Sequence, residues 1–177
     1  SEMSGGISEV HAECIHIFNS KHGIRIKTSP GRGGYVQDIV VSDVTMTNVD
    51  MAFRITGDYG EHPDDHYDPK ALPSINRITI KDIVGVNIKL SGLLEGIEGD
   101  TFRDICLSNV VLNGTSDPPW KCSNITGYSN SVTPEPCEPL WKPIPEDSSV
   151  CYSFGDRRPQ SSNGHRLVSA LMKFAFL

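Results

Sequence analysis

The chain has 177 residues, of which 37% are hydrophobic, and its 16 basic and 22 acidic residues give a formal net charge of −6. This acidic balance argues against nucleic acid as a partner. No segment approaches the roughly 20 apolar residues that a membrane-spanning helix needs, and the length suffices for one domain with a substantial core.

One pattern of apolar residues occurs four times along the chain. Its first position is taken by Val10, Ile39, Ile78 and Ile105, and the next apolar positions follow in the same frame. The repeated unit is 21 residues long, whereas the spacers between units vary in length. A constant unit with variable spacers is typical of a solenoid, in which each coil buries its apolar face against its neighbours.

The spacing inside the unit indicates the kind of solenoid. In the first copy, apolar residues form pairs two positions apart: Val10 with Ala12, Ile15 with Ile17, and Ile24 with Ile26. Such pairs fit strands with one buried face, and the change of parity between pairs requires a turn. We therefore predict an all-β fold, a parallel β-helix of about four coils with three short strands each. An antiparallel β-sandwich also has short strands and turns, but it gives no reason for a repeated frame.

Basic residues occupy the outward face of the third strand in the first two coils. Because Ile24 and Ile26 point inward, Arg25 and Lys27 point outward, and Arg54 takes the position of Arg25 in the next coil. Parallel coils stack about 4.8 Å apart, so Arg25 and Arg54 are expected side by side. Two such charges repel by roughly 0.8 kcal/mol in water. This arrangement suggests an anionic ligand, although the same residues could simply be solvated charges.

Two features after the fourth apolar stretch indicate a secreted protein. N-glycosylation sequons begin at Asn113 and Asn124. Beside them, Cys122 and Cys137 could form a disulfide that stabilises the fold by roughly 3 kcal/mol, or remain two unpaired thiols.

The other three cysteines leave an odd total, so the pairing of Cys14, Cys106 and Cys151 cannot be assigned from sequence. Cys106 lies between the inward residues Ile105 and Leu107 and is expected to point outward.

The C-terminal part of the chain changes character. Five prolines between residues 134 and 145 cannot continue a strand ladder, and they predict an extended cap or linker. We divide the chain into a β-helix part, 1–140, and a mobile polar tail, 141–177. The apolar segment 165–177 is open to three interpretations: a short helix on an open end of the solenoid, a sorting or membrane-surface segment, or an error of gene prediction.

Several short motifs carry a resemblance to a known family. The segment Gly23-Ile24-Arg25-Ile26-Lys27-Thr28, followed by Gly31-Arg32-Gly33-Gly34-Tyr35, looks like the Arg-Ile-Lys motif of glycoside hydrolase family 28, the polygalacturonases. Further similar segments are the opening Ser1–Gly6, the stretch Gly57-Asp58-Tyr59-Gly60, the loop Asp65–Pro73 and the ending Pro119–Cys137. The resemblance covers residues 1 to about 140 and implies a right-handed parallel β-helix, in agreement with the periodicity.

The resemblance implies inverting hydrolysis of α-1,4-linked galacturonic acid in pectin. Such hydrolysis uses two carboxyl groups roughly 6.5–9.5 Å apart. In this family they come from an Asn-Thr-Asp motif and an adjacent Asp pair, which are expected before Ser1, as is the family histidine. We therefore expect no catalytic residue in this chain, which would be the C-terminal part of a longer solenoid. Asp64 and Asp65 follow Arg25 instead of preceding it, and we interpret them as a solvated loop.

The resemblance also implies roles for substrate-binding residues. Arg25 and Lys27 would hold a galacturonate carboxylate just past the cleaved bond, which suits a planar guanidinium fork beside a compact ammonium charge. Tyr59 would line the same cleft, although it could equally serve loop packing. Arg54 is a further candidate for substrate binding, which follows from the stacking of the coils and not from the resemblance.

The expected protein is a secreted, monomeric glycoprotein of the cell wall that acts on pectin or polygalacturonate. No cofactor, metal, nucleic acid or transmembrane segment is expected. Two alternatives remain: a non-catalytic pectin-binding β-helix, and a pectate or rhamnogalacturonan lyase, which would use an arginine base and Ca²⁺. The predicted coils show no acidic cluster that suits calcium.

Overall fold

The computed structural model describes residues 5–60, 67–146, 150–151 and 175–176. Nearly all regular structure in this part of the chain is β-strand. Three strands of 22 residues form one coil each: β1 (Gly6–Lys27), β2 (Tyr35–Thr56) and β3 (Ser74–Glu95). The shorter elements are β4 (Phe102–Leu112), β5 (Trp120–Ser123), β6 (Ile125–Thr133), the 3₁₀ helix η1 (Glu138–Leu140) and β7 (Ala175–Phe176).

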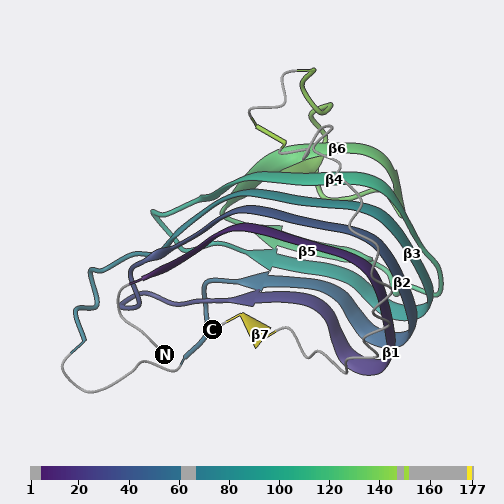
Figure 1. Cartoon of the computed structure of the whole chain (residues 1–177), viewed down its shortest axis with the longest axis horizontal. Coiled ribbons are helices and arrows are strands. Elements are labelled where there is room, and N and C mark those ends of the chain that lie inside the picture. The colour runs from purple at the N-terminus through teal and green to yellow at the C-terminus, as the bar shows by residue number, and fades with distance from the viewer. Residues whose placement is uncertain (1–4, 61–66, 147–149, 152–174, 177) are drawn as a thin grey trace, which may run out of the picture.

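Successive coils stack in parallel, which confirms the predicted parallel β-helix. The strand order is β6-β4-β3-β2-β1-β7, with β5 paired to β3, and Figure 1 shows β1 to β4 following the same curved path. The predicted frame holds at the level of residue pairs, because Val10 pairs with Ile39, Ile39 with Ile78, and Ile78 with Ile105. Residues at equivalent positions of the repeat are therefore direct neighbours in space.

Each coil turns at single residues whose backbone is left-handed. In β1 these are Glu9, Cys14 and Asn19, which follow one another at intervals of five residues. The same spacing returns in β2 and β3, at Asp38, Asp43 and Asn48 and at Arg77, Asp82 and Asn87. Asn and Asp tolerate a positive φ better than other residues with a side chain, and they fill six of these nine corners. The corners explain the changes of parity in the sequence.

Inward side chains form columns that run along the axis of the helix. One column starts at Ile24 and continues through Phe53, Gly92 and Trp120. Because Gly92 has no side chain, the Trp120 ring fills its place and stacks on Phe53, with 5.8 Å between ring centroids. Burying a large apolar side chain stabilises by roughly 1.5–3 kcal/mol, so this column holds three coils together.

The helix continues beyond the coils that the sequence predicts. The repeated apolar pattern ends at Leu112, but β5 completes the fourth coil and β6 begins a fifth. The connection 113–119 between β4 and β5 contains Pro118 and Pro119. This connection interrupts the repeated pattern, so the pattern alone does not predict a strand at Trp120.

The two ends of the helix differ in how well their core is covered. In β1 the inward residues Val10, Ile15 and Ile17 are partly buried, whereas their partners in β2 are buried. Among the described residues, only β7 pairs with the outer edge of β1, at Arg25 and Ile26. At the other end, η1 places the fully buried Leu140 over the last coil.

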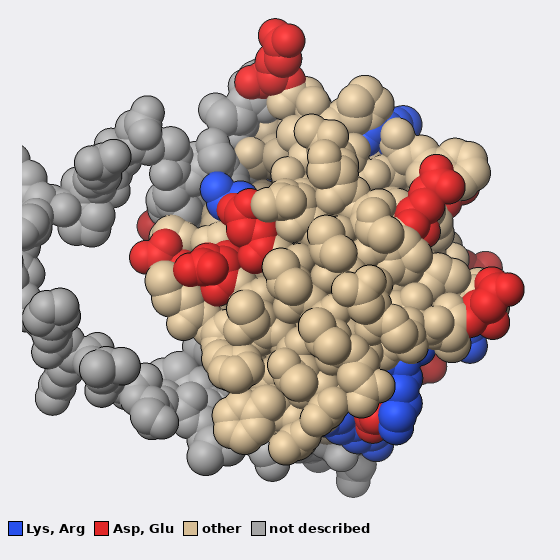
Figure 2. Space-filling view, turned by 90° about the vertical axis from the view of Figure 1, so that its right-hand side faces the viewer, with Lys and Arg blue, Asp and Glu red and all other residues tan. Residues whose placement is uncertain are grey.

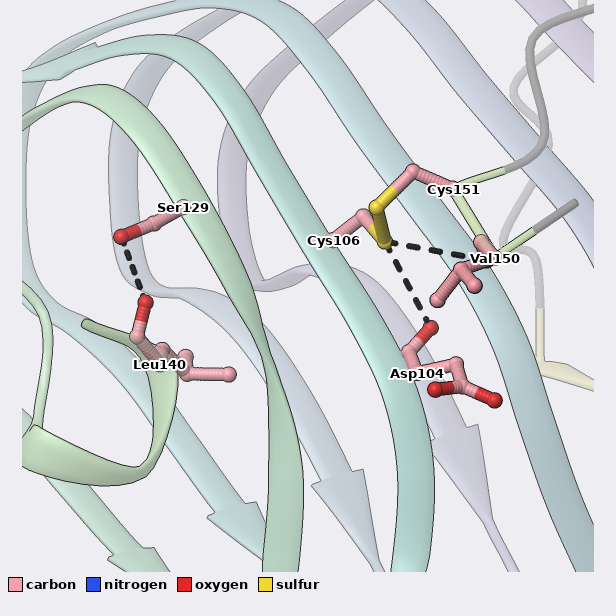
Figure 3. The surroundings of a disulfide bond; sticks show 6 residues. All are labelled: Asp104, Cys106, Ser129, Leu140, Val150 and Cys151. Carbon is pink, nitrogen blue, oxygen red and sulfur yellow. Dashed lines mark hydrogen bonds between the residues drawn. A yellow bond between two sulfur atoms is a disulfide. The ribbon is translucent and has the colours of Figure 1, made fainter. Parts of the chain in front are cut away.

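Two disulfides tie later segments to the helix. Cys122 in β5 is bonded to Cys137, the pairing considered from the sequence. Cys106 in β4 is bonded to Cys151, as Figure 3 shows. Cys106 is fully buried, because the segment that contains Cys151 covers it. Cys14 is exposed and free.

One side of the helix is a broad face with few charges. Figure 2 shows this face, with acidic and basic side chains gathered around its margin. Elsewhere in the described chain, charged side chains also mark the corners and the ends of strands, such as Asp38 and Arg77. The charged side chains therefore collect at the corners and ends of the coils.

The division of the chain at residue 140 stays a prediction. Leu140 packs on the last coil and Cys151 is bonded to β4, while much of 141–177 lies outside the described residues. The segment 165–177 is described only at β7, which is a short strand and not a helix. Within the described residues, no helix has the length and apolar character needed to cross a membrane.

Candidate functional site

The candidate site lies at the end of β1, where the outward residues are Arg25 and Lys27. Both side chains are partly exposed, between the buried residues Ile24 and Ile26 and the buried Thr28. The turn into this segment passes through Gly23, where any side chain would meet the backbone oxygen of Ala52. This close approach seats the end of β1 directly on β2.

The loop after β2 brings Tyr59 to the same place. The Thr28 amide donates to the Thr56 carbonyl (2.9 Å), which continues the ladder past the strand ends. The Asp58 amide then donates to the Thr56 hydroxyl (3.1 Å), and the Tyr59 amide donates to the Thr28 carbonyl (3.0 Å). These three bonds turn the chain back, so that the Tyr59 ring lies over the end of β1.

Three cationic side chains surround the Tyr59 ring. Lys27 Nζ lies 4.2 Å from the ring centroid, and the guanidinium carbons of Arg25 and Arg32 lie 5.7 and 5.5 Å from it. Cations within about 6 Å of an aromatic face are attracted by its quadrupole. Tyr59 therefore gathers positive charges that would otherwise repel one another.

Arg54 extends this cluster onto the second coil. It pairs in register with Arg25, as the stacking argument predicts. In the next coils the same column continues with Leu93 and Lys121, so the adjacent pair of cations ends after two coils. Arg25 Nε and Arg54 Nε are buried and lack a hydrogen-bond partner within the described part of the chain.

Among the residues that the structure describes, Arg25, Lys27 and Arg54 form no ion pair with a carboxylate. The ion pairs in this part of the chain join Asp38 with Arg77 and Asp50 with Lys89, and Glu13 Oε2 lies 3.4 Å from His11 Nε2. A cluster of lysine and arginine around a tyrosine suits the binding of an anionic ligand. Cationic and aromatic groups of this kind do not act as the acid and base of glycoside hydrolysis, which are carboxyl groups.

Two members of the site were not predicted from the sequence. Arg32 is buried in the Gly31–Gly34 loop, and its glycine-rich surroundings were noted only as part of a motif. His22 accepts a hydrogen bond from Arg54, with 3.2 Å between Nε2 and Nη1. Neither alternates with the apolar pair of the third strand as an outward neighbour, which is the signal that identified Arg25, Lys27 and Arg54.

The other sequence-based candidates have different outcomes. Asn113 and Asn124 are exposed, so both sequons are accessible. Asp64 and Asp65 lie outside the described residues. No group of three His, Cys, Asp or Glu side chains that could hold a metal ion occurs in the part of the chain that is described.

Fold and site together define a parallel β-helix whose first two coils carry a cluster of cationic and aromatic side chains. Residues 2–134 match the family described as Glycosyl hydrolases family 28. The chain belongs to this family.

The chain is similar to several named polygalacturonases. It is 49% identical over 154 residues to a probable polygalacturonase from Vitis vinifera, which covers 85% of this chain and 31% of that protein. It is 33% identical over 139 residues to the exopolygalacturonase clone GBGA483 of Arabidopsis thaliana, covering 75% of this chain and 31% of that protein. It is 31% identical over 137 residues to the exopolygalacturonase rpg13 of Rhizopus delemar, covering 71% of this chain and 38% of that protein.

The chain thus spans about a third of the length of these relatives. No solved structure matches the chain.

Proposed function

We propose that this protein is a polygalacturonase-type glycosidase that hydrolyses the α-1,4-galacturonan of pectin, and that residues 1–177 supply part of its substrate-binding surface. Family membership and the names of the relatives support the reaction class. The observation that carries the assignment to an acidic glycan is the pair of cations Arg25 and Lys27 at the Tyr59 ring, with Arg54 beside Arg25 in the sheet. None of these three cations has a carboxylate partner among the described residues.

Each residue of the cluster has a distinct part in binding. Arg25 would pair two oxygens of a uronate carboxylate, and Lys27 would add a compact charge to the same group. The Tyr59 ring would pack on the sugar and keep both cations in place. The acid and the base would come from aspartates outside these 177 residues, because the sequence has no Asn-Thr-Asp motif.

Substitution of Arg25 tests this proposal in the full-length protein. Arg25→Ala removes the bidentate contact, and charged hydrogen bonds contribute about 1.5–3 kcal/mol, so affinity for polygalacturonate is expected to fall roughly 10- to 100-fold. Affinity for a neutral galactan of similar length is expected to change little. Binding is measured by calorimetry, and hydrolysis by release of reducing ends.

A matched control is Arg103→Ala, because Arg103 is an exposed arginine on β4. It should leave both affinities unchanged. Equal losses on the acidic and the neutral glycan after Arg25→Ala would contradict the carboxylate assignment. Binding of polygalacturonate by the full-length protein without release of reducing ends would favour a non-catalytic pectin-binding module.

The proposed site of action is the plant cell wall, reached by secretion. Exposed sequons at Asn113 and Asn124 support this proposal, as do two disulfides, which persist in oxidising compartments. Protein from a plant secretory host should lose the mass of two glycans on enzymatic deglycosylation. An unchanged mass would contradict the glycoprotein assignment.

A further inference from the structure

His22 and Arg54 form a contact that binding of a carboxylate by Arg25 and Lys27 does not require. His22 lies in β1, three residues before Arg25, and Arg54 lies in β2. Arg54 Nη1 is 3.2 Å from His22 Nε2. Since Arg25 pairs with Arg54 in the sheet, this contact fixes the second guanidinium beside the first.

The chemistry of the contact determines the state of His22. A guanidinium only donates hydrogen bonds, so His22 Nε2 must accept, and the imidazole is neutral with its proton on Nδ1. Burial of the ring lowers the pKa of His22, and the charges of Arg25, Arg54 and Lys21 lower it further, while Asp50 opposes them. These are the charged groups that face His22 from β1 and β2. The neutral form is therefore favoured at pH 7.

The direction of the cation column points to a ligand longer than one sugar. Arg25 and Arg54 lie on adjacent coils, which in a parallel sheet are about 4.8 Å apart. A polyuronate carries one carboxylate on each ring, so a chain running along the helix axis would present successive carboxylates to successive coils. The residue at the equivalent position of the third coil is Leu93. Leu93 carries no charge, so the adjacent cations are limited to Arg25 and Arg54.

We propose that Arg54, oriented by neutral His22, binds the carboxylate of the uronate next to the one held by Arg25 and Lys27. This inference rests on the proposed function and deepens it. Arg54 is a second specificity-determining residue, and His22 is a positioning residue that acts only through Arg54. The pair selects for two consecutive unesterified uronates, because a methyl ester removes the charge that Arg54 requires.

The first test compares galacturonate oligomers of one to four residues bound to the full-length protein. Arg54→Leu is the variant of choice, because Leu93 occupies the same column in β3. It should weaken binding of the trimer and tetramer roughly tenfold, as expected for loss of one charged hydrogen-bonded contact, and leave the monomer unchanged. Arg25→Ala should weaken oligomers of every length. Unchanged trimer and tetramer binding by Arg54→Leu, or an equal loss for the monomer, would overturn the inference.

The second test separates His22 from a merely structural role through the pH profile of tetramer binding. As the pH falls through the lowered pKa of His22, the imidazolium can no longer accept from Arg54, and the wild-type protein should lose affinity. His22→Gln keeps an acceptor oxygen that does not titrate, so it should retain neutral-pH affinity without this loss. His22→Leu should bind weakly at every pH. Identical pH profiles for His22→Gln and the wild type would overturn the positioning role.

The two proposals fail in different ways. If Arg25→Ala changed the binding of no oligomer, the proposed function itself would be contradicted. If Arg25→Ala weakened binding of the oligomers and Arg54→Leu did not, only the proposal of a second carboxylate site would be contradicted. Equal midpoints of urea unfolding for all variants establish that the losses reflect binding and not folding.

Discussion

Asp38 and Arg77 occupy the same corner position in successive coils and form a two-point ion pair. Arg77 Nε lies 2.6 Å from Asp38 Oδ1, and Arg77 Nη2 lies 2.8 Å from Oδ2. Hydrogen bonding from Arg77 lowers the pKa of Asp38, with its charge acting in the same direction and burial opposing both. The ionised carboxylate therefore stabilises the folded state.

We expect Asp38→Asn to reduce the free energy of unfolding by about 1 kcal/mol at pH 7, the upper range for partly exposed ion pairs. The pKa of Asp38 is lower in the folded than in the unfolded chain, so its contribution is present above pH 3.8 and is lost as the pH falls through the folded pKa. Urea unfolding at pH 7 and pH 3 measures the difference. The exposed Glu98 offers the control Glu98→Gln, and a loss for Asp38→Asn that is the same at both pH values would contradict the ionic explanation.

The sequence predicts some residues of the candidate site and not others, for a physical reason. Arg25 and Arg54 follow from alternation, because a residue between two buried apolar side chains must point outward. His22 lies in β1 before the apolar pair Ile24 and Ile26, and Arg32 lies in the loop after β1, so the repeated pattern does not fix the direction of either side chain. Their contacts with Arg54 and Tyr59 emerge only from the three-dimensional arrangement.

At the scale of elements, the asparagine corners join the coils through their side chains. Asn48 Nδ2 donates to Asn19 Oδ1 (2.9 Å), and Asn87 Nδ2 donates to Asn48 Oδ1 (2.8 Å). Asn48 has a φ of 55°, which a β-branched residue adopts only with strain. Asn48 thus serves both the backbone turn and the contact between coils.

Two substitutions at Asn48 separate these roles. Asn48→Val loses both hydrogen bonds and adds left-handed strain, so the free energy of unfolding should fall by about 2–3 kcal/mol. Asn48→Gly keeps the turn without strain and should cost about half as much. Urea midpoints give the comparison, and a glycine variant as unstable as the valine variant would show that strain contributes little.

The elements of the first three coils follow from the sequence because their apolar frame is unbroken. β5 does not, because the proline-containing connection 113–119 separates it from β4. Its placement depends instead on Trp120, which fills the space over Gly92 and reaches Phe53. A glycine at an inward position of one coil thus predicts a large side chain at the equivalent position of the next coil. Such a prediction compares residues of different coils, which are far apart in the sequence.

At the scale of the whole molecule, a solenoid holds each coil only through its neighbours, so long-range bonds matter for its stability. The Cys106–Cys151 disulfide links β4 to a residue 45 positions later, whereas Cys122–Cys137 spans 15 positions. The sequence could not pair Cys106, because its partner lies after η1, where no repeat fixes the path of the chain.

Loop-closure entropy predicts different contributions from the two bonds, about 4 kcal/mol for Cys106–Cys151 and about 3 kcal/mol for Cys122–Cys137. The double variant Cys106→Ala/Cys151→Ala should therefore lower the free energy of unfolding more than Cys122→Ala/Cys137→Ala. Cys14→Ser is the control, because Cys14 is exposed and unpaired. Guanidinium unfolding with and without dithiothreitol checks the cause, since reduction should erase the difference between the wild type and each double variant. A difference that persists after reduction would mean that side-chain packing, and not the crosslink, accounts for the lost stability.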